Sequence, residues 1–227
     1  MYYYDSTYIL VLIGFLLSMA AEGAVRLAYS KWDDVQSRTG LTGRDIARRI
    51  LDAGGLQDVP IQMIPGELTD NYDSGSRVLS LSQAVYQTDS VASIGIAAHE
   101  CGHALQDAQN YMPLRIRSNL VPIASVGSRA AIPLFLAGLF FSFRPLQMIG
   151  ICCFLFAVLF YLVTLPVEFD ASRRAIQILS AGVVPEDEMA GVKSVLNAAA
   201  MTYVASALQA MLQMARLILL SQKRRRD

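Results

Sequence analysis

The chain has 227 residues, and 19 Lys and Arg balance 19 Asp and Glu, so its formal net charge is zero. A nucleic-acid-binding protein needs a basic surplus to displace counterions from phosphates, and this balance argues against that class. Apolar residues make up 54% of the chain and charged residues 17%, and the mean hydropathy is +0.39. Soluble domains contain about a quarter charged residues. The three cysteines, two of them adjacent, form no disulfide framework. This composition excludes a soluble secreted domain and predicts a membrane protein.

The first segment, residues 1–25, is predicted to be a transmembrane helix. It carries no charge from Tyr8 to Ala21 and continues past Glu22, which is long enough to cross a bilayer core of about 30 Å. A cleaved signal peptide is the alternative interpretation. It fits less well, because the stretch before the apolar run has no Lys or Arg and contains Asp5.

Residues 26–118 are predicted to form a small α+β module. The helices in it are expected to begin after the N-cap residues Thr42 and Ser90. One strand is indicated by alternating polar and apolar residues, and the other by a short apolar run between turns. The expected elements are two helices at about 43–53 and 91–109 and two strands at about 59–64 and 77–82.

The second half of the chain is predicted to contain a membrane hairpin, residues 119–166. Two apolar helices at about 121–141 and 146–165 are joined there by a short turn. The last segment, residues 167–227, begins with a charged stretch and contains one more helix at about 195–220. That helix is rich in Ala, Met and Leu but also holds polar residues, so it is interpreted either as a fourth span or as a helix at the membrane surface.

The distribution of Lys and Arg predicts the orientation, because cytoplasmic loops carry these residues in excess. They follow the first span, precede the second and follow the third, whereas the turn inside the hairpin holds only Arg144. This places residues 26–118 and the segment after Pro166 on the cytoplasmic side of the cell membrane. The basic cluster at 223–226 would lie outside if the last helix crossed, so the rule favours three spans in this multi-pass protein, with four as the alternative.

The helix expected at 91–109 contains an HExxH motif, His99-Glu100-Cys101-Gly102-His103. Residues four apart stand one above the other on a helix, so both imidazoles can hold one zinc ion. Glu100 then lies beside the metal, where it can act as general base toward a zinc-activated water. These are the only two histidines of the chain, and a pair of buried structural histidines is the alternative.

A catalytic zinc normally has three protein ligands, so a further ligand is needed. The chain has no other histidine, and two of its cysteines lie inside a predicted span, so a carboxylate is expected. Glu168 is the first candidate, because the hairpin brings its two outer ends back to the same membrane face. Asp107, one helical turn beyond His103, and Asp170 are the other candidates, and an ordinary interfacial role is the alternative for Glu168.

These residues resemble a known family, the YugP-type bacterial membrane zinc metallopeptidases, also described as neutral zinc metallopeptidases. The resemblance covers nearly the whole chain. It is carried by an N-terminal helix and by residues 68–73, 78–86, 98–104, 166–174 and 196–208. It implies a minimal zincin-like catalytic module of α+β class combined with membrane spans, Zn²⁺ as cofactor, and hydrolysis of peptide bonds.

The layout is also similar to that of the membrane proteases of the heat-shock and prenyl-protein-processing group. In that group the Glu after the hairpin is the third zinc ligand, which corresponds here to Glu168. An Asp four residues later supports a zinc-bound His there. This sequence departs from that pattern, because Ser172 stands at the corresponding position and Asp170 lies two residues after Glu168.

In the mechanism that the resemblance implies, the two histidines and Glu168 hold Zn²⁺. Glu100 removes a proton from the zinc-activated water, which attacks the substrate carbonyl, and then passes the proton to the leaving amine. An oxyanion donor is also expected. Tyr203 is the first candidate and Arg173 the second, although packing in a helix of small residues also accounts for Tyr203.

The strand at 77–82 is a candidate for binding substrate, because an extended peptide can pair with a strand through main-chain hydrogen bonds. The residues concerned are Val78, Leu79, Ser80 and Leu81. An ordinary place in a sheet is the alternative. The expected partners are a peptide or membrane-protein substrate and the lipid bilayer, with no nucleic acid and no predicted oligomeric state.

Two other functions stay open at this point. An intramembrane zinc protease is one, because residues 91–98 before the motif are apolar. A non-catalytic membrane scaffold stabilised by zinc is the other. A structural zinc site usually fills all four positions with protein ligands, and the sequence offers three, which favours the enzyme.

Overall fold

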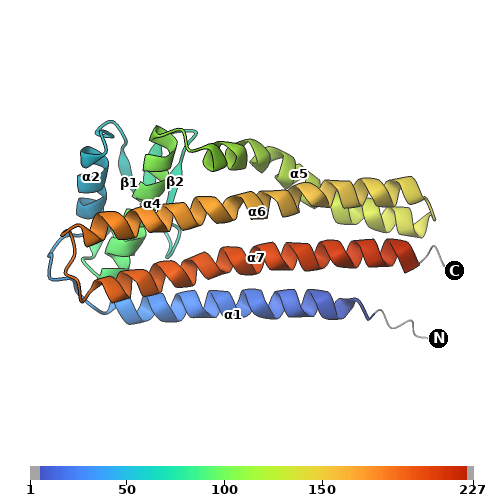
Figure 1. Cartoon of the computed structure of the whole chain (residues 1–227), viewed down its shortest axis with the longest axis horizontal. Helices are drawn as coiled ribbons and strands as arrows, with labels where there is room; N and C mark the ends of the chain where they lie inside the picture. The colour runs from blue at the N-terminus through green and yellow to red at the C-terminus, as the bar shows by residue number, and fades with distance from the viewer. Residues whose placement is uncertain (1–5, 224–227) are drawn as a thin grey trace. The chain divides into compact units, whose positions relative to one another are not determined.

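The structure is a computed structural model and describes residues 6–223. Asp5 and most of the basic cluster at 223–226 lie outside the described residues. The elements are α1 (Tyr8–Asp33), α2 (Gly43–Ala53), β1 (Ile61–Ile64), β2 (Asn71–Asp73), β3 (Val78–Ser82), α3 (Gln83–Gln87), α4 (Val91–Ala108), α5 (Met112–Phe140), α6 (Arg144–Ser180) and α7 (Met189–Lys223) (Figure 1). The predicted α+β class with long apolar helices is confirmed.

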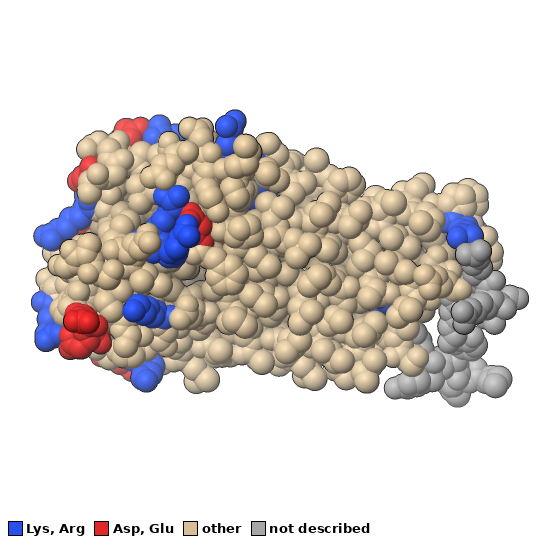
Figure 2. Space-filling model, in the orientation of Figure 1, with Lys and Arg blue, Asp and Glu red and all other residues tan. Residues whose placement is uncertain are grey.

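The chain divides into two compact units. The helical unit comprises residues 1–21, 115–165 and 202–227, and the mixed unit comprises residues 22–114 and 166–201. On the face drawn in Figure 2, charged side chains gather over the mixed unit, and the surface of the helical unit is almost wholly uncharged. On this face, the two units therefore present surfaces suited to different solvents, water and lipid.

Four helices, α1, α5, α6 and α7, are long and apolar enough to cross a membrane. Their most apolar windows are only 6–22% buried within the protein, so most of this apolar surface needs a lipid environment. The last helix meets the same criterion with a mean hydropathy of 1.4. The preference for three spans is therefore not supported, and the alternative of four is.

Contacts within the helical unit show that α7 runs antiparallel to α1. Gly14 of α1 packs against Gln209, where an added Cβ would lie 3.1 Å from the Gln209 Cα. One turn further along α1, Ser18 donates a hydrogen bond of 2.7 Å to the same glutamine. At the start of α1, the guanidinium of Arg216 lies 3.9 Å from the centroid of the Tyr8 ring. A hydrogen bond between spans suits a lipid environment, where a lone polar group is costly.

The mixed unit is built on a three-stranded sheet in the order β1-β3-β2. Strand β3 pairs in parallel with β1 and antiparallel with β2. Leu79 and Leu81 of β3 are fully buried in a core shared with α2, α3 and α4. Asp70, just before β2, accepts hydrogen bonds from the backbone N–H and the hydroxyl of Ser82, which joins the start of β2 to the end of β3. Strand β2 and helix α3 were not predicted.

Helices α2 and α4 begin at the predicted caps and pack against each other (Figure 1). Thr42 and Asp45 form a capping box at the start of α2, and the Ser90 hydroxyl accepts from the Ser93 N–H at the start of α4. Fourteen of the 18 residues of α4 are buried. The helix with the HExxH motif is therefore the central helix of this unit.

Candidate metal centre

Three potential metal ligands come together inside the mixed unit. His99 and His103 project from α4, and Glu168 projects from α6. The Glu168 Oε2 lies 3.3 Å from the His99 Nε2 and 3.4 Å from the His103 Nε2. All three ligand atoms lie within 4.8 Å of one another, and the two rings meet edge to face with centroids 4.8 Å apart. Glu168 is 2% exposed, so its charge needs a close positive partner.

A glycine allows α4 and α6 to approach closely at this point. A Cβ on Gly102 would lie 2.7 Å from the backbone carbonyl oxygen of Ala171, which is shorter than real Cβ contacts. Glycine is therefore required where the two backbones meet. Gly102 adjoins His103 in the chain, and Ala171 lies three residues after Glu168, so the contact brings the ligands of the two helices together.

The outer nitrogen of each imidazole has its own partner. The His99 Nδ1 lies 3.0 Å from the Ser172 hydroxyl, and the His103 Nδ1 lies 3.0 Å from the side-chain oxygen of Gln106. The amide nitrogen of Gln106 donates to the Val167 carbonyl at 2.8 Å and to the Asp170 carboxylate. Since both of those groups only accept, the orientation of the amide is fixed, and His103 must donate from its Nδ1.

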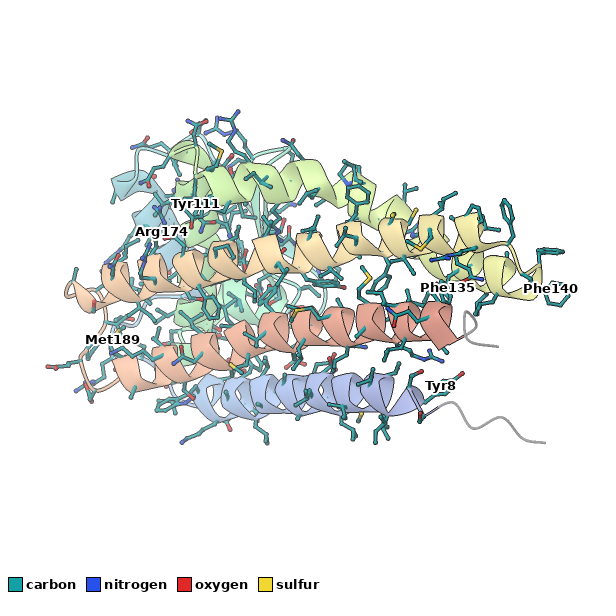
Figure 3. All side chains as sticks on the ribbon, turned by 45° about the vertical axis from the view of Figure 1, so that its right-hand side comes forward. Tyr8, Tyr111, Phe135, Phe140, Arg174 and Met189 are labelled. Atoms are coloured by element: carbon teal, nitrogen blue, oxygen red, sulfur yellow. The ribbon has the colours of Figure 1, made fainter. Side chains whose placement is uncertain are left out.

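The carboxylate that holds Gln106 is itself held by two cations. Asp170 accepts from the Arg174 Nε at 2.6 Å and also forms an ion pair with Arg173. Arg174 extends the chain of contacts by donating to Gln109 at 2.6 Å. Its guanidinium lies 5.8 Å from the centroid of the Tyr111 ring, and both side chains are labelled in Figure 3. A continuous network therefore connects the surface of this unit with the second histidine.

The donor set fits zinc. Two imidazole nitrogens and one carboxylate oxygen are a common ligand set of catalytic zinc. Ligand atoms about 2.05 Å from a tetrahedral ion stand about 3.3 Å apart, which matches both separations made by the Glu168 oxygen. With its Nδ1 held by Gln106, His103 turns its Nε2 toward this carboxylate oxygen. A zinc ion between these two atoms would be coordinated by both of them.

Glu100 lies next to His99 in the chain and is 9% exposed. It is close enough to Asp70 to affect that residue: burial raises the pKa of the Asp70 carboxyl, and the negative charge of Glu100 adds to the effect. Both carboxylates therefore lie in the same interior region of the mixed unit.

The other carboxylates considered as third ligand have different partners. Asp107 accepts a hydrogen bond of 2.9 Å from the Tyr72 hydroxyl. Burial, together with this hydrogen bond, raises the pKa of Tyr72 to about 12. Asp170 binds Gln106 and the two arginines. Among the described residues, neither joins the group formed by the two histidines and Glu168.

The structure changes the expectation for the strand at 77–82. Val78, Leu79, Ser80 and Leu81 lie on β3, the central strand, which is hydrogen-bonded to β1 on one edge and to β2 on the other. Strand β2 covers one edge at residues 78–80 and β1 covers the other at residues 79–82, so little of either edge of β3 is left for a substrate. Within the part of the chain that the structure describes, the outer edges of β1 and β2 have no neighbouring strand in this sheet.

The two candidate oxyanion donors lie in different units. Tyr203 belongs to the helical unit, whereas Arg173 belongs to the mixed unit with the three ligands. Arg173 is largely exposed and paired with Asp170.

Gln106 was not recognised as a functional residue from the sequence. Gln106 follows His103 by three residues on the same helix face, and this spacing was the signal available for it. The resemblance placed Ser172 where the related proteases have a supporting Asp but did not assign it that role, and its hydroxyl lies beside the His99 Nδ1.

Comparison with known proteins agrees with this geometry. Residues 7–222 match the family described as "Putative neutral zinc metallopeptidase". The chain is 43% identical over 205 residues to the "Putative membrane protease YugP" of Bacillus subtilis (strain 168), covering 90% of this chain and 91% of that protein. No solved structure matches the chain. The family match spans almost the whole sequence, and the chain belongs to the neutral zinc metallopeptidase family.

Proposed function

We propose that this protein is a membrane-bound zinc-dependent endopeptidase, with His99, His103 and Glu168 as the zinc ligands and Glu100 as the general base. The observation that carries the proposal is the arrangement of three donor atoms around one centre, on the half-buried His99 and the buried His103 and Glu168, with the outer nitrogen of each histidine held by another side chain. Three protein ligands leave one coordination position for water or substrate, as in catalytic rather than structural zinc sites.

In this proposal each residue of the site has a separate chemical role. Bound zinc would supply a Lewis acid that polarises the water and the substrate carbonyl. Glu100 takes a proton from the attacking water and delivers it to the leaving nitrogen of the peptide bond. Ser172 and Gln106 hold the two imidazoles with the Nε2 atoms toward the shared centre. Arg173 is the candidate within this unit for stabilising the developing oxyanion, and Tyr203 stays a candidate from the helical unit.

A peptide substrate fits this unit because the sheet offers strand edges. An extended chain binds an edge strand by main-chain hydrogen bonds, which requires little of its sequence. The edges of β1 and β2 are the ones available in place of β3. The substrate class that we propose is therefore an extended segment of a peptide or of a membrane protein.

The proposed location is the cell membrane, with the site facing the cytoplasm. Arg115 and Arg117 precede the apolar part of α5, and Arg173 and Arg174 follow that of α6. Four spans would leave both ends of the chain on the opposite side. Tags at the two ends, labelled in whole cells and in inverted vesicles, test this orientation. Labelling of either tag only from the cytoplasmic side would contradict it.

The test of the activity compares wild type with Glu100→Gln and with Glu67→Gln, a control carboxylate on the surface. With casein as substrate, Glu100→Gln should lose about 10²–10⁴-fold in rate and keep its fold and zinc, because only the proton transfer is removed. Glu67→Gln should behave as wild type.

Equal rates in wild type and Glu100→Gln would contradict the proposed base, and a wild type that binds zinc but is inactive on any peptide would favour a scaffold. Cleavage of a membrane-spanning substrate with none of casein would favour an intramembrane protease.

A further inference from the structure

The helical unit contains a cavity of about 440 Å³ that is lined by residues of all four long helices. Its polar lining consists of Ser128, Tyr161, Ser206, Gln209, Gln213 and Arg216. All of these residues lie on helices that are candidate membrane spans. Polar and charged side chains are costly inside a bilayer, and they are usually found where a ligand or a pathway needs them. This cavity therefore needs an explanation beyond packing.

The polar residues contributed by α7 form one stripe. Ser206, Gln209, Gln213 and Arg216 are spaced by three, four and three residues, which places them on a single helix face. Gln209 has a structural role, because it accepts the hydrogen bond from Ser18 of α1. This hydrogen bond explains Gln209 but does not explain why Ser206, Gln213 and Arg216 also line the cavity.

The stripe runs from the end of a span toward its middle. Arg216 lies over the ring of Tyr8, the residue at which α1 begins, and Figure 3 labels this residue at the start of that helix. Ser206 lies ten residues before Arg216, which is about 15 Å along a helix. The cavity therefore has its cation near a membrane boundary and neutral hydrogen-bonding groups deeper in the bilayer.

The size and chemistry of the cavity limit its occupant. Its described lining contains no Asp or Glu, and Arg216 and Tyr161 supply hydrogen-bond donors, which favours an anionic ligand. One turn of a helix about 10 Å wide and 5.4 Å in pitch fills about 420 Å³, so the cavity holds about a single turn. This is too little for a transmembrane segment of a substrate, but it lies within the range of small-molecule sites.

The cavity is bordered by side chains that face outward to lipid. Ile132 is 41% exposed and Tyr161 is 36% exposed, and both line it. An amphiphile can therefore place its head group inside while its acyl chains stay along the outer surface of α5 and α6. A small soluble anion would make no use of this apolar border.

We propose that this cavity binds the phosphate-bearing head group of an anionic phospholipid, with Arg216 at the phosphate and Tyr161 and Gln213 as neutral hydrogen-bond donors. Basic pockets between transmembrane helices on the cytoplasmic side of other membrane proteins bind such head groups. The same charge pairing applies at the opposite boundary, where Arg216 lies in the proposed orientation. The site lies in the helical unit and uses none of the proposed zinc ligands.

The test uses the full chain in nanodiscs of phosphatidylcholine with phosphatidylglycerol, and counts the lipids that remain bound after release into native mass spectrometry. Wild type should retain phosphatidylglycerol in preference to phosphatidylcholine. Arg216→Gln should reduce this retention at least about tenfold, because charge-assisted hydrogen bonds are lost. Arg129→Gln is the matched control, because Arg129 is an exposed arginine of the same unit outside the cavity lining, and it should retain the lipid.

Gln213→Leu provides a second variant that keeps the charge, and it should also weaken retention. Both cavity variants should keep the zinc content of wild type, which separates this site from the metal centre. Equal loss in Arg129→Gln, or no preference for phosphatidylglycerol in wild type, would overturn the proposal. Binding of inorganic phosphate or glycerol 3-phosphate as tight as that of the lipid would also overturn it, because the apolar border would then contribute nothing. The release of a bound transmembrane peptide in place of lipid would overturn it as well.

Discussion

Replacement of Gln106 tests how far the metal centre depends on its surroundings. Gln106 is completely buried and connects three groups: the His103 Nδ1, the Val167 carbonyl and the Asp170 carboxylate. Gln106→Leu would remove three hydrogen bonds at about 1 kcal/mol each, so the free energy of unfolding should fall by about 3 kcal/mol. Partners of metal-binding histidines typically contribute 10–100-fold to affinity, which corresponds to about 1.4–2.7 kcal/mol. We therefore expect zinc affinity to fall by that factor.

Gln106→Glu separates the two roles of this residue. Glutamate still accepts from the His103 Nδ1, but its second oxygen would face the Val167 carbonyl and the Asp170 carboxylate without a proton to donate. This variant should lose stability while zinc affinity falls less than in Gln106→Leu. Gln83→Leu, at an exposed position, is the control.

The assays for these variants are competition with a chelating dye for zinc affinity and thermal unfolding in detergent for stability. Wild-type zinc affinity in Gln106→Leu would refute the conclusion that this amide positions the histidine. A loss of affinity as large in Gln83→Leu would also refute it.

Three further substitutions or labels test other parts of the structure. Gly102→Ala should destabilise the protein by about 1–3 kcal/mol and lower its zinc content, because the added methyl group meets a backbone carbonyl of α6. Thermal unfolding measures the stability. It should show no such loss in the control variant Gly23→Ala, because the space around Gly23 is open. Cys101 should resist maleimide in the folded protein, because burial raises the pKa of its thiol, and labelling of Cys101 before unfolding would contradict this. The exposed Cys152 provides the comparison in detergent. Ser172→Ala should lower zinc affinity by about tenfold, measured by competition with the chelating dye. An affinity equal to that of wild type would show that the Ser172 hydroxyl does not support His99.

The long helices and the two histidines could be predicted from the sequence because their signals are local. Hydropathy over some twenty residues identifies a span, and a spacing of four residues places two side chains on one helix face. The cap at Thr42 likewise needs only its neighbours in the chain. Each of these predictions depends on residues within one element.

The ends of the long helices were predicted less well. The hairpin was expected to end at Pro166, but α6 passes through this proline and continues to Ser180. Likewise, α5 begins at Met112, before the apolar run. Hydropathy reports where lipid contact ends, and a helix can continue beyond that point when its next turns pack on protein, as Val167 and Ala171 do.

Features that depend on packing between elements could not be predicted. Strand β2 has only three residues and is defined by its pairing with β3. That pairing also makes β3 the central strand, so the outer edges of the sheet lie on β1 and β2 instead. The resemblance pointed to position 172, but whether a serine there reaches His99 depends on the distance between α4 and α6 at Gly102, which leaves no periodic signal in the sequence.

The central claim is that His99, His103 and Glu168 hold a catalytic zinc ion, and zinc content per chain tests it most directly. The measurement compares purified wild type with Glu168→Ala and Glu168→Gln after loading with zinc and removal of excess metal. Near-stoichiometric zinc in wild type and a sharp fall in both variants is the predicted result. Full retention of zinc in both variants would remove Glu168 from the ligand set, and wild type without zinc after loading would contradict the metallopeptidase mechanism itself.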